Sequence, residues 1–109
     1  MATTRVTPFL RCDLDANLLR PAWVALNPNG LPAACFVLEI FNNTNMGINV
    51  SLDGINPHFY LAAGTDKIYD FQTNSQLPGK ECLVAKGTVI YVSATAAGIG
   101  TVMLSGFYV

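Results

Sequence analysis

This sequence has few charged residues. Lys, Arg, Asp and Glu together make up 12% of the 109 residues, against about 25% in a typical globular domain. Apolar residues make up 51%. A surface with so little charge must show amides, hydroxyls, glycine and apolar side chains to water, which suits a protein that is packed against neighbours. The alternative is a charge-poor protein that is stable as a monomer.

Runs of basic residues and long apolar runs are also missing. The cations are scattered singly along a chain of net charge −1, so a nucleic-acid partner is not expected, because phosphate binding needs clustered Lys and Arg. No stretch approaches the roughly 20 apolar residues of a membrane span, and the polar start is not followed by a secretory apolar segment. We therefore expect synthesis in the cytoplasm and no membrane partner.

Cysteine and histidine are too few, and too far apart, for the common reactive sites. Cys12, Cys35 and Cys82 are odd in number, form no CxxC pair and lie in apolar segments, so buried free thiols are favoured over a disulfide or a metal role. His58 is the one histidine, and no nucleophile motif or zinc-ligand spacing accompanies it. We expect no enzymatic activity and no cofactor.

Carboxylates leave two chemical alternatives to weigh. Asp13 and Asp15 lie two residues apart on one face of a strand, as acid pairs of hydrolases sometimes do, but a solvated strand end is the ordinary explanation and is favoured here. Asp66 and Asp70 flank a short strand and Asp53 ends another, and their oxygens could serve a calcium ion. No EF-hand pattern accompanies them. The sequence therefore predicts no catalytic or metal residues, and leaves a structural calcium open.

Turn residues divide the chain into short segments at the spacing of about 8 to 12 residues that marks a sandwich or barrel. Period-2 alternation recurs and helical periodicity does not. We predict an all-β, compact antiparallel β-sandwich of eight to nine short strands with a jelly-roll or Greek-key topology, as one domain over residues 1–109 with residues 1–5 as an N-terminal arm. The strands are expected near residues 5–14, 22–26, 33–41, 48–52, 58–61, 67–72, 81–85, 88–94 and 101–109.

Particular residues give these segments their expected detail. In the first strand, Leu10 falls on the apolar face, and Pro8 indicates an edge or a break because proline cannot donate to a ladder. One helical turn is plausible after Asp15, closed by Pro21. A turn is expected at residues 27–30. The run at 33–41, interrupted by Glu39, is typical of a strand buried on both faces over most of its length, and residues 42–45 mark its end.

Three stretches carry a resemblance to a known class of proteins. They are Ile48–Gly54, which ends in Asp-Gly, His58–Thr65, which ends in Ala-Gly-Thr, and Tyr69–Phe71. This order resembles a pattern in small virion proteins of tailed bacteriophages. With the size, the low charge and the expected jelly roll, the chain is similar to the decoration, cement or staple proteins of short-tailed phages. The resemblance implies no catalytic residues.

The function predicted from these observations is that of a non-enzymatic virion protein on the capsid surface. It would bridge and stabilise major capsid subunits, as a dimer or trimer. Its candidate contacts are the polar arm, an unpaired edge and one aromatic anchor: Ala2, Thr3, Thr4, Arg5, Pro8 and Trp23. The arm could equally be frayed. The alternative function is a lectin-like or receptor-binding module of a tail, fibre or cell surface, in which Trp23 or a tyrosine stacks on sugar.

Overall fold

The computed structural model describes residues 7–70 and 84–108, and these form two antiparallel sheets. Within these ranges the chain has nine strands, one 3₁₀ turn (η1, Ala16–Leu18) and no α-helix, which confirms the all-β prediction. The strands are β1 (Thr7–Pro8), β2 (Cys12–Asp15), β3 (Val24–Ala25), β4 (Cys35–Thr44), β5 (Ile48–Ser51), β6 (Phe59–Leu61), β7 (Asp66–Asp70), β8 (Tyr91–Ser93) and β9 (Gly100–Tyr108).

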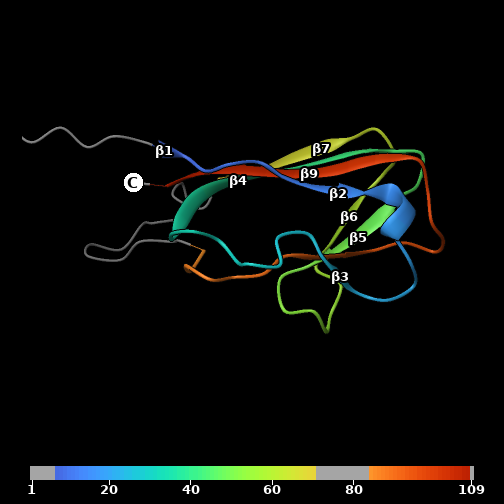
Figure 1. Cartoon of the computed structure of the whole chain (residues 1–109), viewed down its shortest axis with the longest axis horizontal. Coiled ribbons are helices and arrows are strands. Elements are labelled where there is room, and N and C mark those ends of the chain that lie inside the picture. Colours follow the sequence, from blue (N-terminus) through green and yellow to red (C-terminus); the bar gives the residue numbers. More distant parts are fainter. Residues whose placement is uncertain (1–6, 71–83, 109) are drawn as a thin grey trace, which may run out of the picture.

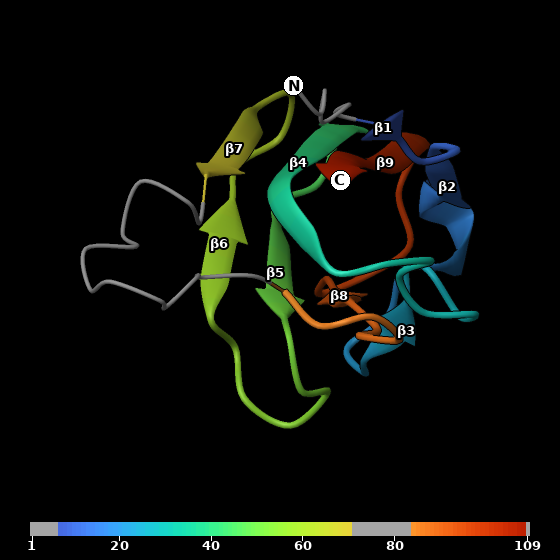
Figure 2. The same cartoon turned by 90° about the vertical axis from the view of Figure 1, so that its left-hand side faces the viewer.

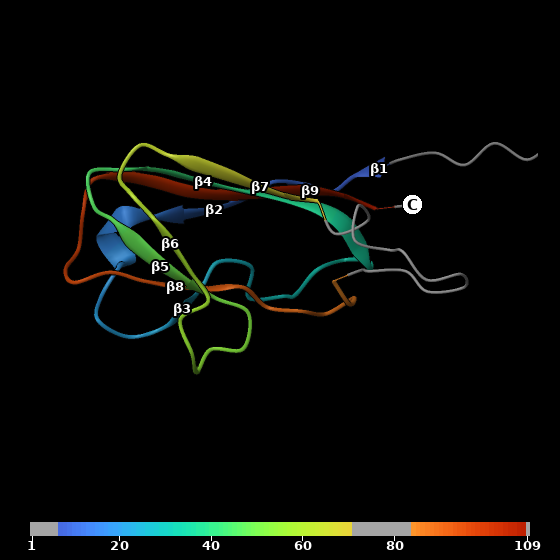
Figure 3. The same cartoon turned by 180° about the vertical axis from the view of Figure 1, so that it is seen from behind.

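The two sheets lie face to face as the layers of a sandwich (Figure 1, Figure 2). The first sheet has the order β1-β9-β4-β7, with β2 also paired to β9, and the second has the order β3-β8-β5-β6. The pairs are nested along the chain: β2 with β9, β3 with β8, β4 with β7 and β5 with β6, all antiparallel. This nested order, rolled into two sheets, is a jelly roll. The view from behind shows the same two layers (Figure 3).

Apolar side chains from alternate positions of both sheets fill the space between the layers. Those with at most 1% of their surface exposed include Leu38, Ile40, Ile48, Val50, Ile90, Val92, Val102 and Leu104. The prediction that β4 is buried on both faces is wrong. Val37, Glu39 and Phe41, which alternate with its buried residues, are only half-buried, because no described element covers the outer face of the first sheet.

An extra residue between β1 and β2 reverses the predicted pattern of the first strand. Pro8 pairs with Phe107, and Cys12 pairs with Leu104, so the three residues 9–11 face the two residues 105–106. Such a bulge exchanges the inward and outward positions. Phe9 is therefore buried, whereas Leu10, expected on the apolar face, is 92% exposed. The edge position of Pro8 is confirmed, since β1 pairs only with β9.

The turn at residues 27–30 and the helical turn after Asp15 form as predicted. The Gly30 N–H donates to the Asn27 carbonyl at 2.8 Å, and Gly30 has a φ of 76° that favours glycine. The Asp15 carboxylate accepts the Asn17 N–H at the start of η1. Two predicted strands extend beyond the described residues. Phe71–Gln72 and residues 81–83 lie outside, and Val84 forms a bridge with Cys35.

The strand was expected to span 33–41 with its end marked by residues 42–45, and β4 continues through Asn42 to Thr44. The Asn42 side chain is fully buried. Its Nδ2 donates toward the carbonyl oxygens of Met46 at 2.8 Å and of Leu61 and Ala62 at 3.1 Å each. Its Oδ1 accepts the Thr44 hydroxyl at 2.6 Å. The sequence did not reveal this role, because two of these partners, Leu61 and Ala62, belong to a segment that local sequence does not connect to Asn42.

The backbone of Asn42 is bonded as thoroughly as its side chain. Its N–H donates to the Thr65 carbonyl at 2.8 Å, and its carbonyl accepts the Gly64 N–H at 2.9 Å. Asn42 thus joins β4, the turn that leads into β5, and the connection between β6 and β7. These elements belong to both sheets, so one residue ties the two layers together at this corner.

We expect Asn42→Ala to lower the free energy of unfolding by about 3 kcal/mol, because it leaves buried carbonyls without donors. Asn43→Ala is the matched control, since Asn43 is the exposed neighbour on the same strand, and it should change stability by less than about 0.5 kcal/mol. Urea unfolding followed by Trp23 fluorescence measures both. Equal effects of the two substitutions would contradict the role given to Asn42.

Cys12 and Cys35 are free thiols, as predicted, and Cys82 lies outside the described residues. Cys35 is fully buried and Cys12 is half-buried. Burial raises the pKa of both thiols, and the Asp13 carboxylate raises that of Cys12 further. Both thiols are therefore held in the protonated form, which is the less reactive one.

In a Cys82→Ser protein at pH 8, we expect a thiol reagent to modify Cys12 slowly and Cys35 more slowly still. Burial disfavours the thiolate at both positions, and Cys35 has no surface that the reagent can reach. Both should react rapidly in denaturant. Labelling followed by mass spectrometry gives the two rates, and a Cys35 rate equal to that of Cys12 would show that the core opens more easily than this packing implies.

Candidate functional site

No described element covers the outer face of the first sheet (Figure 2). Apolar side chains, including those of Ile68 and Phe107, are exposed on this face. Strand register arranges the outward residues of β7, β4 and β9 in rows. Two of the rows are Asp66, Phe41 and Met103, and Ile68, Glu39 and Ser105. A third row joins Val37, Phe107 and Pro8 across β4, β9 and β1. This arrangement mixes large apolar groups with one central carboxyl.

A groove of about 200 Å³ lies on this face. We call it the β4–β9 groove, and its lining residues are Pro8, Phe9, Val37, Glu39, Ile68, Ser105, Gly106 and Phe107. Ile68 is 59% exposed and Phe107 is 42% exposed. Ligand pockets for small molecules usually enclose about 300 to 1,000 Å³. The β4–β9 groove is therefore of a size to receive a side chain from another protein.

Glu39 is the ionisable group of the groove. Partial burial among apolar neighbours raises the pKa of its carboxyl, and the hydrogen bond and negative charge of Asp66 raise it further. A hydrogen bond from Ser105 acts in the opposite direction, because it favours the ionised form. The groove thus holds a carboxyl that is poorly solvated and lies beside a second carboxyl.

The structure places the predicted interface residues in separate regions. Pro8 is exposed in β1 and lines the groove. Trp23 is half-buried and directly precedes β3, which belongs to the second sheet. Ala2, Thr3, Thr4 and Arg5 lie outside the described residues. Sequence reasoning missed Ile68 and Phe107, although the interruption of an apolar run by Glu39 was a visible signal that one side of β4 is solvated.

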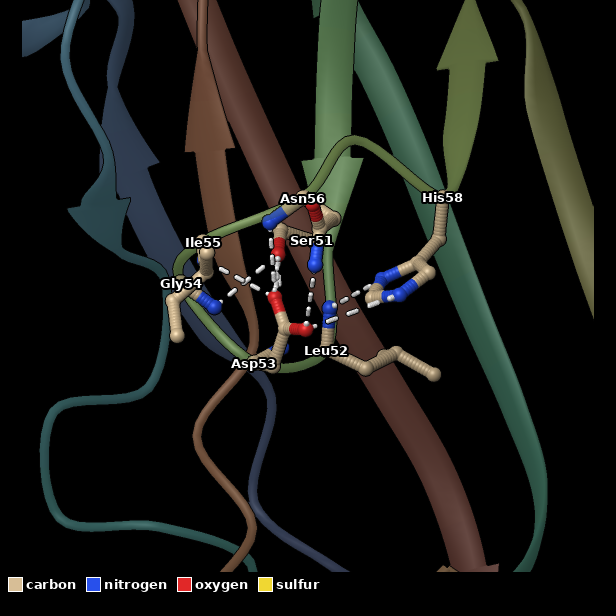
Figure 4. A network of polar contacts seen from close by, with 7 residues as sticks. All are labelled: Ser51, Leu52, Asp53, Gly54, Ile55, Asn56 and His58. Carbon is tan, nitrogen blue, oxygen red and sulfur yellow. Dashed lines mark hydrogen bonds and ion pairs between the residues drawn. The ribbon is translucent and has the colours of Figure 1, made fainter.

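A second polar cluster lies in the loop between β5 and β6 (Figure 4). Oδ1 of Asp53 accepts the N–H groups of Ile55 at 2.8 Å and Asn56 at 2.9 Å. The same oxygen accepts the hydroxyl of Ser51 at 2.8 Å. Gly54 takes a φ of 74°, so the predicted Asp-Gly turn is confirmed. The carboxylate fixes the loop by binding its backbone.

These donors hold the pKa of Asp53 well below its ordinary value. The Asn56 and Ile55 N–H groups have the largest effects, followed by the Ser51 hydroxyl. All of them favour the ionised carboxylate, which can accept more hydrogen bonds than the acid. Asp53 is exposed to water, so this network organises a surface loop.

The same cluster contains serine, histidine and aspartate, but their contacts are not those of a hydrolase triad. Nδ1 of His58 accepts the Leu52 N–H at 3.0 Å, and Nε2 lies 3.8 Å from Oδ2 of Asp53. The fully buried Ser51 donates to Asp53 and accepts the Gly54 N–H at 2.9 Å. A nucleophilic serine must donate to the histidine instead. The arrangement therefore supports a turn rather than acyl transfer.

The other carboxylates take part in local contacts. Asp13 forms an ion pair with Arg11 at 2.8 Å, and Asp15 caps η1. Within residues 7–70 and 84–108, His, Cys, Asp and Glu form no group of three or more that could hold a metal ion. In the same part of the chain, no helix has the length and apolar character needed to cross a membrane.

No family model and no curated protein matches this chain. Among solved structures it is similar to the Dit protein of phage SPP1, described as a paradigm of the hub adsorption apparatus in phages that infect Gram-positive bacteria. The two are 12% identical, and the alignment covers 95% of this chain and 49% of that one, with a TM-score of 0.43. The chain thus spans about half the length of the Dit protein.

We expect a carboxyl NMR titration to place the pKa of Asp53 below the value of about 3.9 found in unfolded chains. Because the folded pKa is lowered, the stability that Asp53 contributes is present above about pH 4 and is lost as the pH falls through the folded pKa. Ser51→Ala should raise the pKa, since it removes one donor. Ser93→Ala, at a half-buried serine of β8, is the control and should leave it unchanged.

Proposed function

We propose that this chain is a non-enzymatic virion structural protein that binds the outside of a phage capsid as a decoration or cement protein. In this role the outer face of the first sheet docks on major capsid subunits. The observation that carries the proposal is the set of exposed apolar side chains around the β4–β9 groove, including Ile68 and Phe107. Apolar surface of this kind gains free energy when a complementary surface covers it.

Three features support assembly over catalysis. The reactive residue types are few, and the described serine, histidine and aspartate cluster is engaged in a turn. Little charge is available to keep copies apart or to steer a charged substrate. The jelly roll is a fold that viral capsid proteins and lectins both use. The fold alone is therefore compatible with two binding functions, and the exposed side chains distinguish between them.

The alternative function, a lectin-like or receptor-binding module, has one observation in its favour. Tyr60 on β6 is 66% exposed and pairs with the exposed Asn49 on β5. Ser93 pairs with the same Asn49 from β8. An exposed aromatic ring beside amide and hydroxyl groups suits stacking on a sugar. This group lies on the second sheet, so the two functions use different faces and can be separated by substitution.

The test mixes the purified protein with phage shells that lack it and sediments the mixture at about 0.5 M salt, where surface charges no longer act at a distance. We expect binding to persist, and the shells to gain heat stability. Ile68→Asn should weaken binding about tenfold or more, because it removes a large apolar side chain from the contact. Tyr60→Asn is the matched control, because Tyr60 is 66% exposed, close to the 59% of Ile68, and lies on the other sheet.

Two results would count against the capsid proposal. One is a protein that never sediments with shells or that detaches as salt rises. The other is loss of binding by the Tyr60 variant while the Ile68 variant still binds. The second result, joined to binding of oligosaccharides by the unmodified protein, would favour the lectin-like function.

A further inference from the structure

The β4–β9 groove combines apolar walls with a carboxyl. Pro8 of β1, Phe107 of β9, Val37 of β4 and Ile68 of β7 supply apolar surface, together with Phe9, which follows β1. Glu39 lies on β4, the strand between β9 and β7, and pairs with Ser105 of β9 and Ile68 of β7. A wholly apolar partner would leave this carboxyl buried without a counter-charge, which is costly.

The charges around the groove favour a cation as the group that covers Glu39. Asp66 acts on Glu39 as a second negative group from β7. Arg11, which lies between β1 and β2, is engaged with Asp13 at 2.8 Å. Lys67 pairs with Ile40, whose side chain faces the core, so Lys67 alternates to the other side of β7. The described part of this face therefore offers Glu39 no free positive partner.

Lysine and arginine side chains combine an aliphatic stem with a charged end. The stem can lie along Ile68, Val37 and Phe107 while the cation meets the Glu39 carboxyl. The Phe107 ring, which is 42% exposed at the groove, adds a surface that attracts cations. A volume of about 200 Å³ accommodates one such side chain and little more.

We propose that the β4–β9 groove receives a lysine or arginine side chain of the docking partner, with its stem against the apolar walls and its cation on Glu39 and Asp66. This inference rests on the proposed function, because it names the chemistry of the partner at the same face. The binding surface of the partner is then a mixed one, in which a long basic side chain projects from apolar surroundings.

The test titrates the full chain with N-acetyl-lysine-N-methylamide and, separately, with the norleucine analogue, which has the same stem length without the charge. Amide NMR signals of Ile68 and Phe107 report binding in the groove. At pH 7.5 we expect the lysine probe to bind about fivefold more tightly than the norleucine probe. Glu39→Gln should remove most of this preference. Asp13→Asn, at an acid on the same sheet but outside the groove lining, should preserve it.

The preference should also depend on pH in a definite direction. A bound cation stabilises the ionised carboxyl, so the affinity of the lysine probe should rise as the pH rises through the pKa of Glu39, and that pKa should fall when the probe saturates. Asp66 is the described ionisable group that acts on Glu39, and Asp66→Asn separates its contribution. The affinity of the norleucine probe should not rise with pH in this way.

Equal binding of the two probes, or a preference that survives Glu39→Gln, would overturn the inference. So would a change in the Glu39 signal of the free protein on Arg5→Ala or Lys80→Ala, since a cation of the chain itself would then fill the groove.

The shell experiment distinguishes the two proposals. If shells bind the unmodified and Glu39→Gln proteins alike, docking stands and the cationic contact is wrong. If the protein never binds shells but the groove prefers the lysine probe, the capsid role fails and the groove chemistry stands.

Discussion

The buried amide of Asn42 is the interaction on which the rest of this sandwich depends. It lies where the chain leaves the first sheet for the second, and it supplies donors to carbonyls on both sides of that step. In a low-dielectric interior such hydrogen bonds are strong when complete and costly when broken. The amide therefore stabilises one arrangement of β4, β5 and β6 over others that would bury the same apolar surface. Hydrophobic packing fills the core, and the hydrogen bonds of Asn42 determine how the chain passes from the first sheet to the second at this corner.

Asn27 has a related role at another corner of the fold. Its Nδ2 donates to the Thr88 carbonyl at 3.0 Å, and its Oδ1 accepts the Ile90 N–H at 2.7 Å. The side chain thus pairs with the chain just before β8 as a strand would, and it extends the short β3 beyond its last residue. In both places a buried asparagine satisfies backbone groups that lack a neighbouring strand. The short strands of the second sheet are held in place by such contacts as well as by their ladders.

The sequence predicts the strands well where a two-residue period reports burial, as in Ile48 and Val50. It fails where the deciding contact is distant. Asn42 looked like a loop residue because its bonding partners at positions 61 and 62 cannot be inferred from local pattern. Phe9 and Leu10 were assigned to the wrong faces, because one extra residue before β2 shifts the alternation. The candidate site shows the same limit: Pro8 was identified as an edge, but the groove exists only once register sets Ile68 and Ser105 on either side of Glu39.

The nested pairing of the strands also determines how far the chain must travel to find its partners. The Asp53 loop closes β5 on β6 across residues 52–58, whereas β2 meets β9 only when Asp15 reaches Thr101. The entropy lost on closing a loop grows with its length, and folds dominated by distant pairings assemble slowly, over milliseconds to seconds. The innermost hairpin is thus the least costly place to begin, and each later pair closes a loop already shortened by the one inside it. On this physical ground, the exposed Asp53 turn has an importance for the speed of folding that its position on the surface does not suggest.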